Sequence, residues 1–156
     1  MQTAKWNRER AFTLIELLIA LLIAGSLLSI AVPSYQEYIE RTRRTAASKD
    51  IAVLALRLES HRERVGVFPA SLADLGITLP TDPWGRSYQY LAIDIAPPPS
   101  TGQVRRDKNM NPLNSDFDLY SMGPDGQTQK QLTAAKARDD IVRAGNGGFI
   151  GLASEH

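Results

Sequence analysis

Apolar residues follow different patterns in successive parts of the chain, and each pattern predicts a different element. Residues 12–32 read FTLIELLIALLIAGSLLSIAV, an apolar run long enough to cross a bilayer as a helix. Between Pro33 and about Arg64 the apolar residues recur at steps of three and four, which is typical of a helix with one buried face. Beyond Gly66 short apolar runs alternate with Gly, Pro and Asp, which indicates strands and turns.

The second helical segment carries one stripe of apolar residues with a histidine at its edge. The stripe consists of Ala47, Ile51, Leu54, Leu58, His61 and Val65, and charged residues occupy mostly the other faces. Such a stripe packs on the sheet of its own domain, so we expect His61 to be packed or solvated rather than a ligand.

The remainder of the chain predicts one short helix and two strands. Ser71 to Leu75 forms the helix, with Ser71 as its N-cap and Asp74 three positions later. The strands cover residues 88–93 and 116–121. Residues 96–115 between them form an irregular insertion, and a flexible linker at 145–148 precedes a docking terminal segment at 149–152. The fold class is therefore α+β: one long N-terminal helix, its inner half in a membrane, packed on a small antiparallel sheet with a C-terminal loop.

Charges around the apolar run predict how it lies in the membrane. Lys5, Arg8 and Arg10 outweigh Glu9 before the run, which places the N-terminus in the cytoplasm and the following domain outside. Glu16 is the exception within the run, where a charged carboxylate costs about 2–4 kcal/mol. Glu16 either reaches the interface or is neutral, or it meets a cation inside the membrane.

The residues around Glu16 carry a resemblance. Residues 11–16, AFTLIE, together with the basic leader and the apolar run, resemble the prepilin-peptidase site of type IV pilins and pseudopilins. The resemblance implies cleavage between Ala11 and Phe12, N-methylation of Phe12, and an assembly role for Glu16 toward the Phe12 amine of a neighbouring subunit. Pro33 lies where that family has a helix-kinking proline. The family usually has Gly before the cut, so Ala11 predicts slower processing.

Motifs further along the chain narrow the resemblance. A DPWG turn at residues 82–85, an aromatic strand at 88–90 and the stretch DLYSMGPDG at 118–126 resemble, in this order, the major pseudopilins of type II secretion systems. The implied organisation is a prepilin leader at 1–11, a transmembrane helix at 12–32, the periplasmic half of the helix at 33–65 and a periplasmic globular domain at 66–156.

The resemblance also implies function, partners and location. It implies a homo-oligomeric filament that drives protein export, with prepilin peptidase, minor pseudopilins and an inner-membrane assembly platform as partners. The subunit is then a single-pass inner-membrane protein with a periplasmic C-terminal domain. A type IV pilus subunit is the alternative. A second alternative is a soluble binding domain released after Ala31, because Ser29-Ile30-Ala31 fits a signal peptidase site.

Composition removes other functions. The net charge is +1, so no nucleic acid partner is expected, and the chain has no cysteine for disulfides or thiolate chemistry. Two histidines and no phosphate-binding glycine motif give no basis for an enzyme.

A calcium ion is the one cofactor that the resemblance implies. Asp118, Ser121 and Asp125 match the motif of the family's C-terminal calcium loop, and Asp139 and Asp140 lie where that loop closes. Carboxylate and hydroxyl oxygens are the ligands that calcium prefers. Residues 127–138 lack the Gly-rich acidic stretch of that loop and carry Lys130, Lys136 and Arg138. A hydrogen-bonded aspartate turn without metal is the other interpretation.

Overall fold

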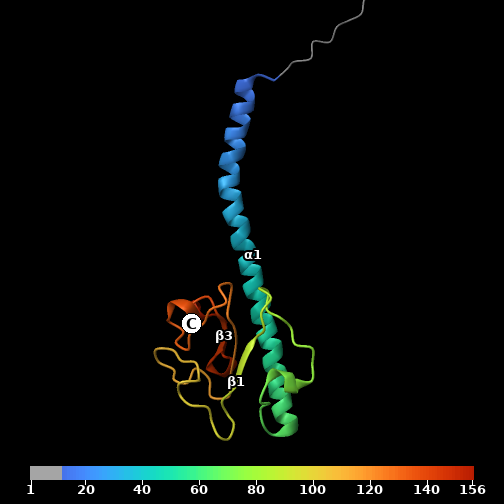
Figure 1. Cartoon of the computed structure of the whole chain (residues 1–156), viewed down its shortest axis with the longest axis vertical. Coiled ribbons are helices and arrows are strands. Elements are labelled where there is room, and N and C mark those ends of the chain that lie inside the picture. Colours follow the sequence, from blue (N-terminus) through green and yellow to red (C-terminus); the bar gives the residue numbers. More distant parts are fainter. Residues whose placement is uncertain (1–11) are drawn as a thin grey trace, which may run out of the picture. The chain divides into compact units, whose positions relative to one another are not determined.

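The computed structural model describes residues 12–156 of the chain. One long helix, α1 (Leu14–Val65), precedes short 3-10 helices and a four-stranded sheet (Figure 1). The predicted end of the long helix near Arg64 is confirmed. By packing, the chain divides into two compact units between Ile39 and Glu40, so residues from Glu40 onward in α1 belong to the same unit as the sheet.

The sheet is antiparallel throughout, in the order β1-β2-β3-β4. Its strands are β1 (Gln89–Ala92), β2 (Phe117–Ser121), β3 (Ile141–Ala144) and β4 (Phe149–Leu152). The predicted α+β class is thereby confirmed, and so are the two predicted strands, which correspond to β1 and β2. Strand β3 was not predicted, because its four residues are too few to show a period.

The segment between β3 and β4 differs from its prediction. Residues 145–148 form a tight turn containing a short 3-10 helix (Gly145–Gly147), not a flexible linker. Asn146 has φ 55° and is the only non-glycine residue with positive φ in the part of the chain that the structure describes. Its side chain accepts the Ser115 N–H and donates to the Ser115 hydroxyl, which holds the turn. The terminal segment then pairs with β3 as an edge strand.

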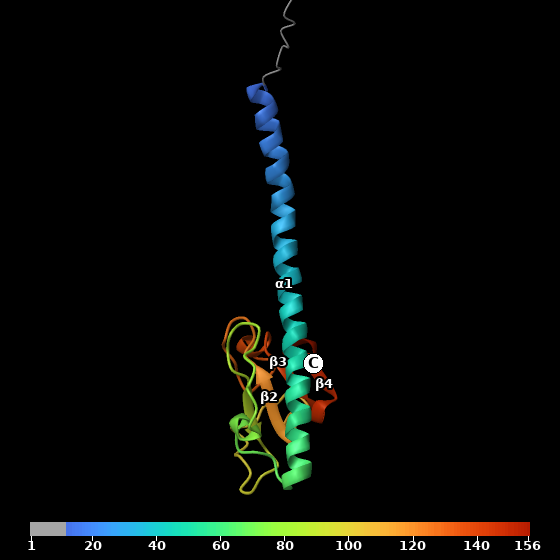
Figure 2. The ribbon, with the colours of Figure 1, turned by 90° about the vertical axis from the view of Figure 1, so that its right-hand side faces the viewer.

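The main core lies between α1 and one face of the sheet (Figure 2). The buried residues of α1 are Ala47, Ile51, Leu54, Ala55 and Leu58, and they pack against Phe117, Leu119 and Ile141 of the strands. The predicted stripe is confirmed over most of its length. It ends one turn early, since Val65 is 54% exposed.

The opposite face of the sheet, called here the loop face, is covered by irregular chain. Because side chains alternate along a strand, Asp118 and Tyr120 of β2 point away from Phe117 and Leu119. A second apolar cluster on this face combines residues of the insertion, the C-terminal loop and strand β3: Leu113, Leu132, Val142, Ala144 and Ala153. The insertion therefore has no regular element yet contributes buried residues.

The short helix (Leu72–Leu75) confirms the predicted cap. The Asp74 carboxylate accepts hydrogen bonds from the Ser71 N–H at 2.8 Å and from the Ser71 hydroxyl at 2.9 Å.

Candidate functional site

Helix α1 begins with a capping box that involves Glu16. Thr13 precedes the helix, and its N–H and hydroxyl donate to the Glu16 carboxylate at 2.9 and 2.7 Å. The Glu16 N–H donates in return to the Thr13 hydroxyl at 3.3 Å. This reciprocal arrangement satisfies backbone donors that the first turn of a helix leaves open. The T-x-x-E spacing signals such a box in the sequence, and the interpretation of Glu16 as an assembly residue overlooked it.

The first part of α1 is apolar on all sides. Its side chains are exposed in the single chain, including Leu14, Leu22 and Ile30 at 75, 73 and 70%. Among the described residues, α1 is the one helix that is long and apolar enough to cross a membrane. A helix with apolar side chains on every face requires lipid or other protein chains around it. The arrangement fits the predicted transmembrane segment.

The processing residues lie at the edge of the described chain. Ala11 lies outside the described residues, so the structure does not describe the predicted cleavage site as a whole. Phe12 is non-helical and 79% exposed. Pro33 lies inside α1, which continues through it. Proline has no N–H to donate to the carbonyl four residues earlier, and the Ser34 hydroxyl donates to the Ile30 carbonyl in the same turn.

Asp82 joins the DPWG turn (residues 82–85) to the stretch DLYSMGPDG (residues 118–126). One carboxylate oxygen accepts the N–H groups of Trp84 and Arg86 at 3.1 and 2.8 Å, which forms the DPWG turn. The other oxygen accepts the hydroxyl of Ser121, at the end of β2, at 2.6 Å. The Trp84 indole N–H donates to Glu40 of α1 at 3.2 Å. The turn therefore ties α1 to β2, and Ser121 has a carboxylate partner from the other motif.

Asp118 and Asp140, two of the predicted calcium ligands, are both bonded to Arg105. The Asp118 carboxylate accepts the Arg105 main-chain N–H at 2.7 Å and the Asn114 amide at 3.0 Å. The Asp140 carboxylate accepts the Arg105 guanidinium at 2.5 Å and the Thr128 hydroxyl at 2.6 Å. Burial raises the pKa of Asp118, and it raises the pKa of Asp140 to about 6, against the opposing effect of Arg105.

The other two predicted carboxylates close a surface turn. Asp139 accepts the Asp125 N–H at 3.3 Å, and Asp125 accepts the Gln127 N–H at 2.7 Å. Gly123 has φ 62° and lies against Asp139, so a Cβ at this position would be 2.2 Å from the Asp139 carbonyl oxygen. The close approach of the two backbones therefore requires glycine here.

These five residues do not fit a calcium ion as they are arranged. Calcium takes six to eight oxygen ligands. No group of three or more His, Cys, Asp or Glu side chains that could hold a metal occurs within residues 12–156. Each of the five side chains already has a protein partner, and Asp140 is paired with a guanidinium. Calcium stays a prediction, and this arrangement argues against it.

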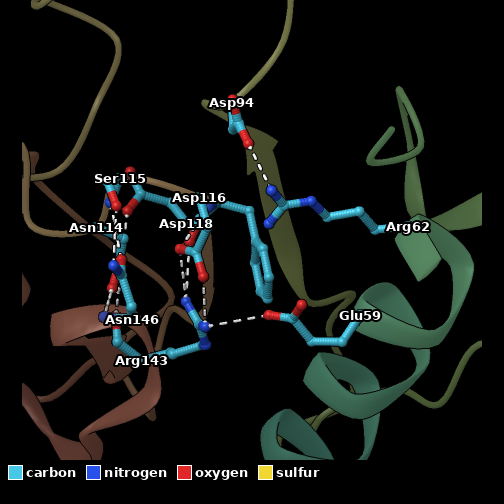
Figure 3. Close-up of polar contacts among 10 residues, drawn as sticks. Glu59, Arg62, Asp94, Asn114, Ser115, Asp116, Asp118, Arg143 and Asn146 are labelled. Carbon is cyan, nitrogen blue, oxygen red and sulfur yellow. Dashed lines mark hydrogen bonds and ion pairs between the residues drawn. The ribbon is translucent and has the colours of Figure 1, made fainter. Parts of the chain in front are cut away.

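A second buried arginine joins the strands to α1 (Figure 3). Arg143 of β3 is paired with Asp116 at 2.6 Å and with Glu59 of α1 at 3.7 Å, and it lies over the Phe117 ring at 4.0 Å. Asn114 donates to both Asp118 and the Arg143 carbonyl. Sequence reasoning missed this network, because its members are far apart in the chain and each is a common surface residue by type.

A family model described as "Prokaryotic N-terminal methylation motif" matches residues 6–32. These residues contain the basic segment, the predicted cleavage site and the apolar run. The match agrees with the resemblance drawn from residues 11–16.

Similarity to whole proteins extends further. "Type II secretion system core protein G" of Pseudomonas aeruginosa is 28% identical over 142 residues, which cover 78% of this chain and 87% of that protein. The protein of the same name from Vibrio cholerae is 26% identical over 153 residues, which cover 84% of this chain and 91% of that protein. "Type IV major alpha-pilin" of Moraxella bovis is 46% identical over 46 residues, covering 30% and 29%. The resemblance to major pseudopilins is therefore confirmed, whereas similarity to the pilin is restricted to less than a third of each chain.

Proposed function

We propose that this chain is a structural subunit of a type II secretion pseudopilus, a helical filament that drives protein export across the outer membrane. The observation that carries the proposal is the similarity to core protein G, which spans most of both chains. The fold supports it, since one helix joins an exposed apolar segment to a small globular unit.

The exposed apolar segment gives the subunit two successive environments. Before assembly it lies in the inner membrane, with the N-terminus in the cytoplasm and the globular unit in the periplasm. Prepilin peptidase cuts between Ala11 and Phe12, and Phe12 is then N-methylated. In the filament, other copies replace lipid around the helix. Head-to-tail contacts that do not close into a ring produce such a filament.

Glu16 is the residue with the most specific role in this scheme. Its carboxylate neutralises the new Phe12 amine of a neighbouring subunit, which removes two unpaired charges from an apolar surrounding. In the single chain the carboxylate is held by Thr13 of its own chain. The proposed partners beyond copies of this chain are minor pseudopilins and an inner-membrane assembly platform. The role is structural and requires no catalytic residue, cofactor or nucleic acid.

Glu16→Gln separates the charge from the cap. Glutamine also serves at this position of a capping box, so the variant keeps the helix start and loses the negative charge. We expect Glu16→Gln and Glu16→Ala in the native host both to insert and to be cleaved, and neither to assemble. Cross-linking of filaments and assay of exported proteins measure this, with Ser26→Ala in the same helix as control. Normal assembly of Glu16→Gln would contradict the charge role and leave only the cap.

Intact mass spectrometry of the protein from host membranes tests the processing pathway. The expected mature chain begins at N-methylated Phe12. A soluble chain beginning at Val32 would instead establish cleavage after Ala31 and the released binding domain.

A type IV pilus subunit remains the second candidate, favoured by the local similarity to the Moraxella pilin. Deletion of the gene distinguishes the two. Loss of exported proteins with intact surface pili supports the secretion role, and loss of surface pili with intact export supports the pilus role.

A further inference from the structure

Arg105 connects three separate parts of the loop face through one side chain and its own main chain. Its main-chain N–H donates to Asp118 of β2, and its guanidinium donates to Thr128 at 2.9 Å and to Asp140 at 2.5 Å. The guanidinium carbon lies 4.0 Å from the centre of the Tyr120 ring. The side chain is 3% exposed, so the cation is inside the protein.

The chain on either side of Arg105 is also fixed to the C-terminal loop. The Arg106 N–H donates to the Lys130 carbonyl at 2.9 Å, and the Leu132 N–H donates to the Arg106 carbonyl at 3.0 Å. The Lys130 ammonium donates to the Gln103 carbonyl. The insertion thus runs beside residues 130–132 and places the guanidinium between Thr128 and Asp140 of the C-terminal loop, residues 122–140.

We propose that Arg105 takes the place of a metal ion in holding the C-terminal loop, so that this chain folds and keeps its stability without calcium. A calcium ion would join the loop by attracting oxygens from both of its ends. The guanidinium supplies a fixed positive charge and donors directed at the Thr128 and Asp140 oxygens. The second Asp140 oxygen is buried without a hydrogen-bond partner, and one oxygen does not make a calcium site.

The position of Arg105 in the insertion explains how a side chain can replace a metal ion in this chain. Calcium arrives from solution, whereas Arg105 belongs to residues 96–115, which lie between β1 and β2 in the chain. The Leu113 N–H donates to the Arg105 carbonyl at 2.7 Å, and Asn114 is bonded to Asp118. The loop itself adds positive charge through Lys130, Lys136 and Arg138 instead of further ligands.

Thermal unfolding of the full chain in detergent micelles tests the proposal, with Trp fluorescence as the signal. The wild-type Tm is expected to be the same in millimolar calcium chloride and in excess EGTA. A ligand that binds only the folded state raises Tm with its concentration. A rise of several degrees with calcium would overturn the proposal.

Variants test the ion pair itself. Arg105→Gln leaves a buried carboxylate without its cation, and we expect Tm to fall by about 10 °C or more, with no recovery in calcium. Arg106→Gln is the matched control, because the neighbouring Arg106 side chain bonds to Gln131 at an exposed position, and we expect a fall of about 2 °C or less. A Tm of Arg105→Gln within the range of this control would overturn the proposal.

A double variant covers the case in which Arg105→Gln does not fold. In Arg105→Gln/Asp140→Asn neither charge is left unpaired, so its Tm should lie above that of Arg105→Gln. A Tm of the double variant at or below that of the single variant would show that the pair does not act as a unit. These measurements read unfolding and not assembly, so their outcome is independent of the secretion proposal.

Discussion

The two faces of the sheet are covered in different ways. Toward α1 the contacts are mainly apolar, with Leu58 and Ile51 in one cluster with Phe117 and Ile141, and the buried Arg143–Asp116 pair lies beside this cluster. On the loop face, charged and polar side chains are buried beside a smaller apolar cluster, and Arg105, Asp118 and Asp140 are all at most 2% exposed. The helix side is thus held mainly by area removed from water, and the loop side mainly by particular pairs of partners.

The two kinds of contact differ in how well they tolerate substitution. An apolar side chain accepts many neighbours of suitable volume, so the helix face can be repacked at modest cost. A buried guanidinium accepts only a placed carboxylate or hydroxyl, and loss of one partner leaves the other unpaired. Substitutions on the two faces should therefore differ in how they respond to a second substitution.

Leu58→Ala is expected to have the largest effect of the predictions made for the two faces. Leu58 is fully buried against the sheet, so truncation should lower the free energy of unfolding by about 2–5 kcal/mol. Leu56→Ala, two residues away on the same helix, removes a side chain that is 70% exposed and should change it by less than about 0.5 kcal/mol. Denaturant unfolding of both variants measures the contrast, and equal losses would show that the helix face is not the main core.

Arg143→Gln should have the next largest effect and lower the free energy of unfolding by about 3 kcal/mol. Arg143 is 3% exposed, and its removal would leave Asp116 with little solvent and no cation. Arg62→Gln is the matched control, since its pair with Asp94 is 44% and 56% exposed and should contribute less than about 1 kcal/mol. Double variants with Asp116→Asn and Asp94→Asn extend the contrast. Coupling should be large for the buried pair and small for the exposed one.

Tyr88→Phe should have the smallest effect, about 1–2 kcal/mol at neutral pH, through loss of the hydrogen bond to Asp50 at 2.8 Å. Burial raises the pKa of Tyr88, and the hydrogen bond to Asp50 raises it further. The phenol of the unfolded chain ionises near pH 10, so the contribution of Tyr88 is complete below about pH 10 and declines above it.

The gap in unfolding free energy between wild type and Tyr88→Phe should therefore narrow as the pH rises above 10. Burial also raises the pKa of Tyr90, but Tyr90 is present in both proteins and cancels in the difference. A constant gap across this range would contradict the assignment to Tyr88.

The sequence predicted the helix face much better than the loop face. The long helix, its stripe, β1 and β2 follow from periodicity, because burial along a regular element repeats at a known step. The partners of Arg105 do not follow, since Asp118 is 13 and Asp140 35 positions away, and nothing local marks them as a pair. Similarly, the DPWG turn could be predicted from its residues, whereas the bond from Ser121 to Asp82 spans 39 positions.

The N-terminal site was predicted by resemblance in one respect and left incomplete in another. The motif at residues 11–16 is supported by the family match over residues 6–32. The partner of Glu16 within its own chain could have been read from the T-x-x-E spacing, which is a local signal. It was missed because the carboxylate was considered only as a charge in a membrane.

The capping box at Thr13 has a consequence for the assembly proposed for this chain. In the single chain the Glu16 carboxylate already accepts two hydrogen bonds from Thr13. If Glu16 has the role proposed above, the amine of a neighbouring subunit would have to compete with Thr13 for the carboxylate. A charge-assisted hydrogen bond from an ammonium is stronger than one from a neutral donor, and exclusion of water strengthens it further. Under the proposed assembly role of Glu16, the cap would favour subunits that arrive in register over those that merely collide.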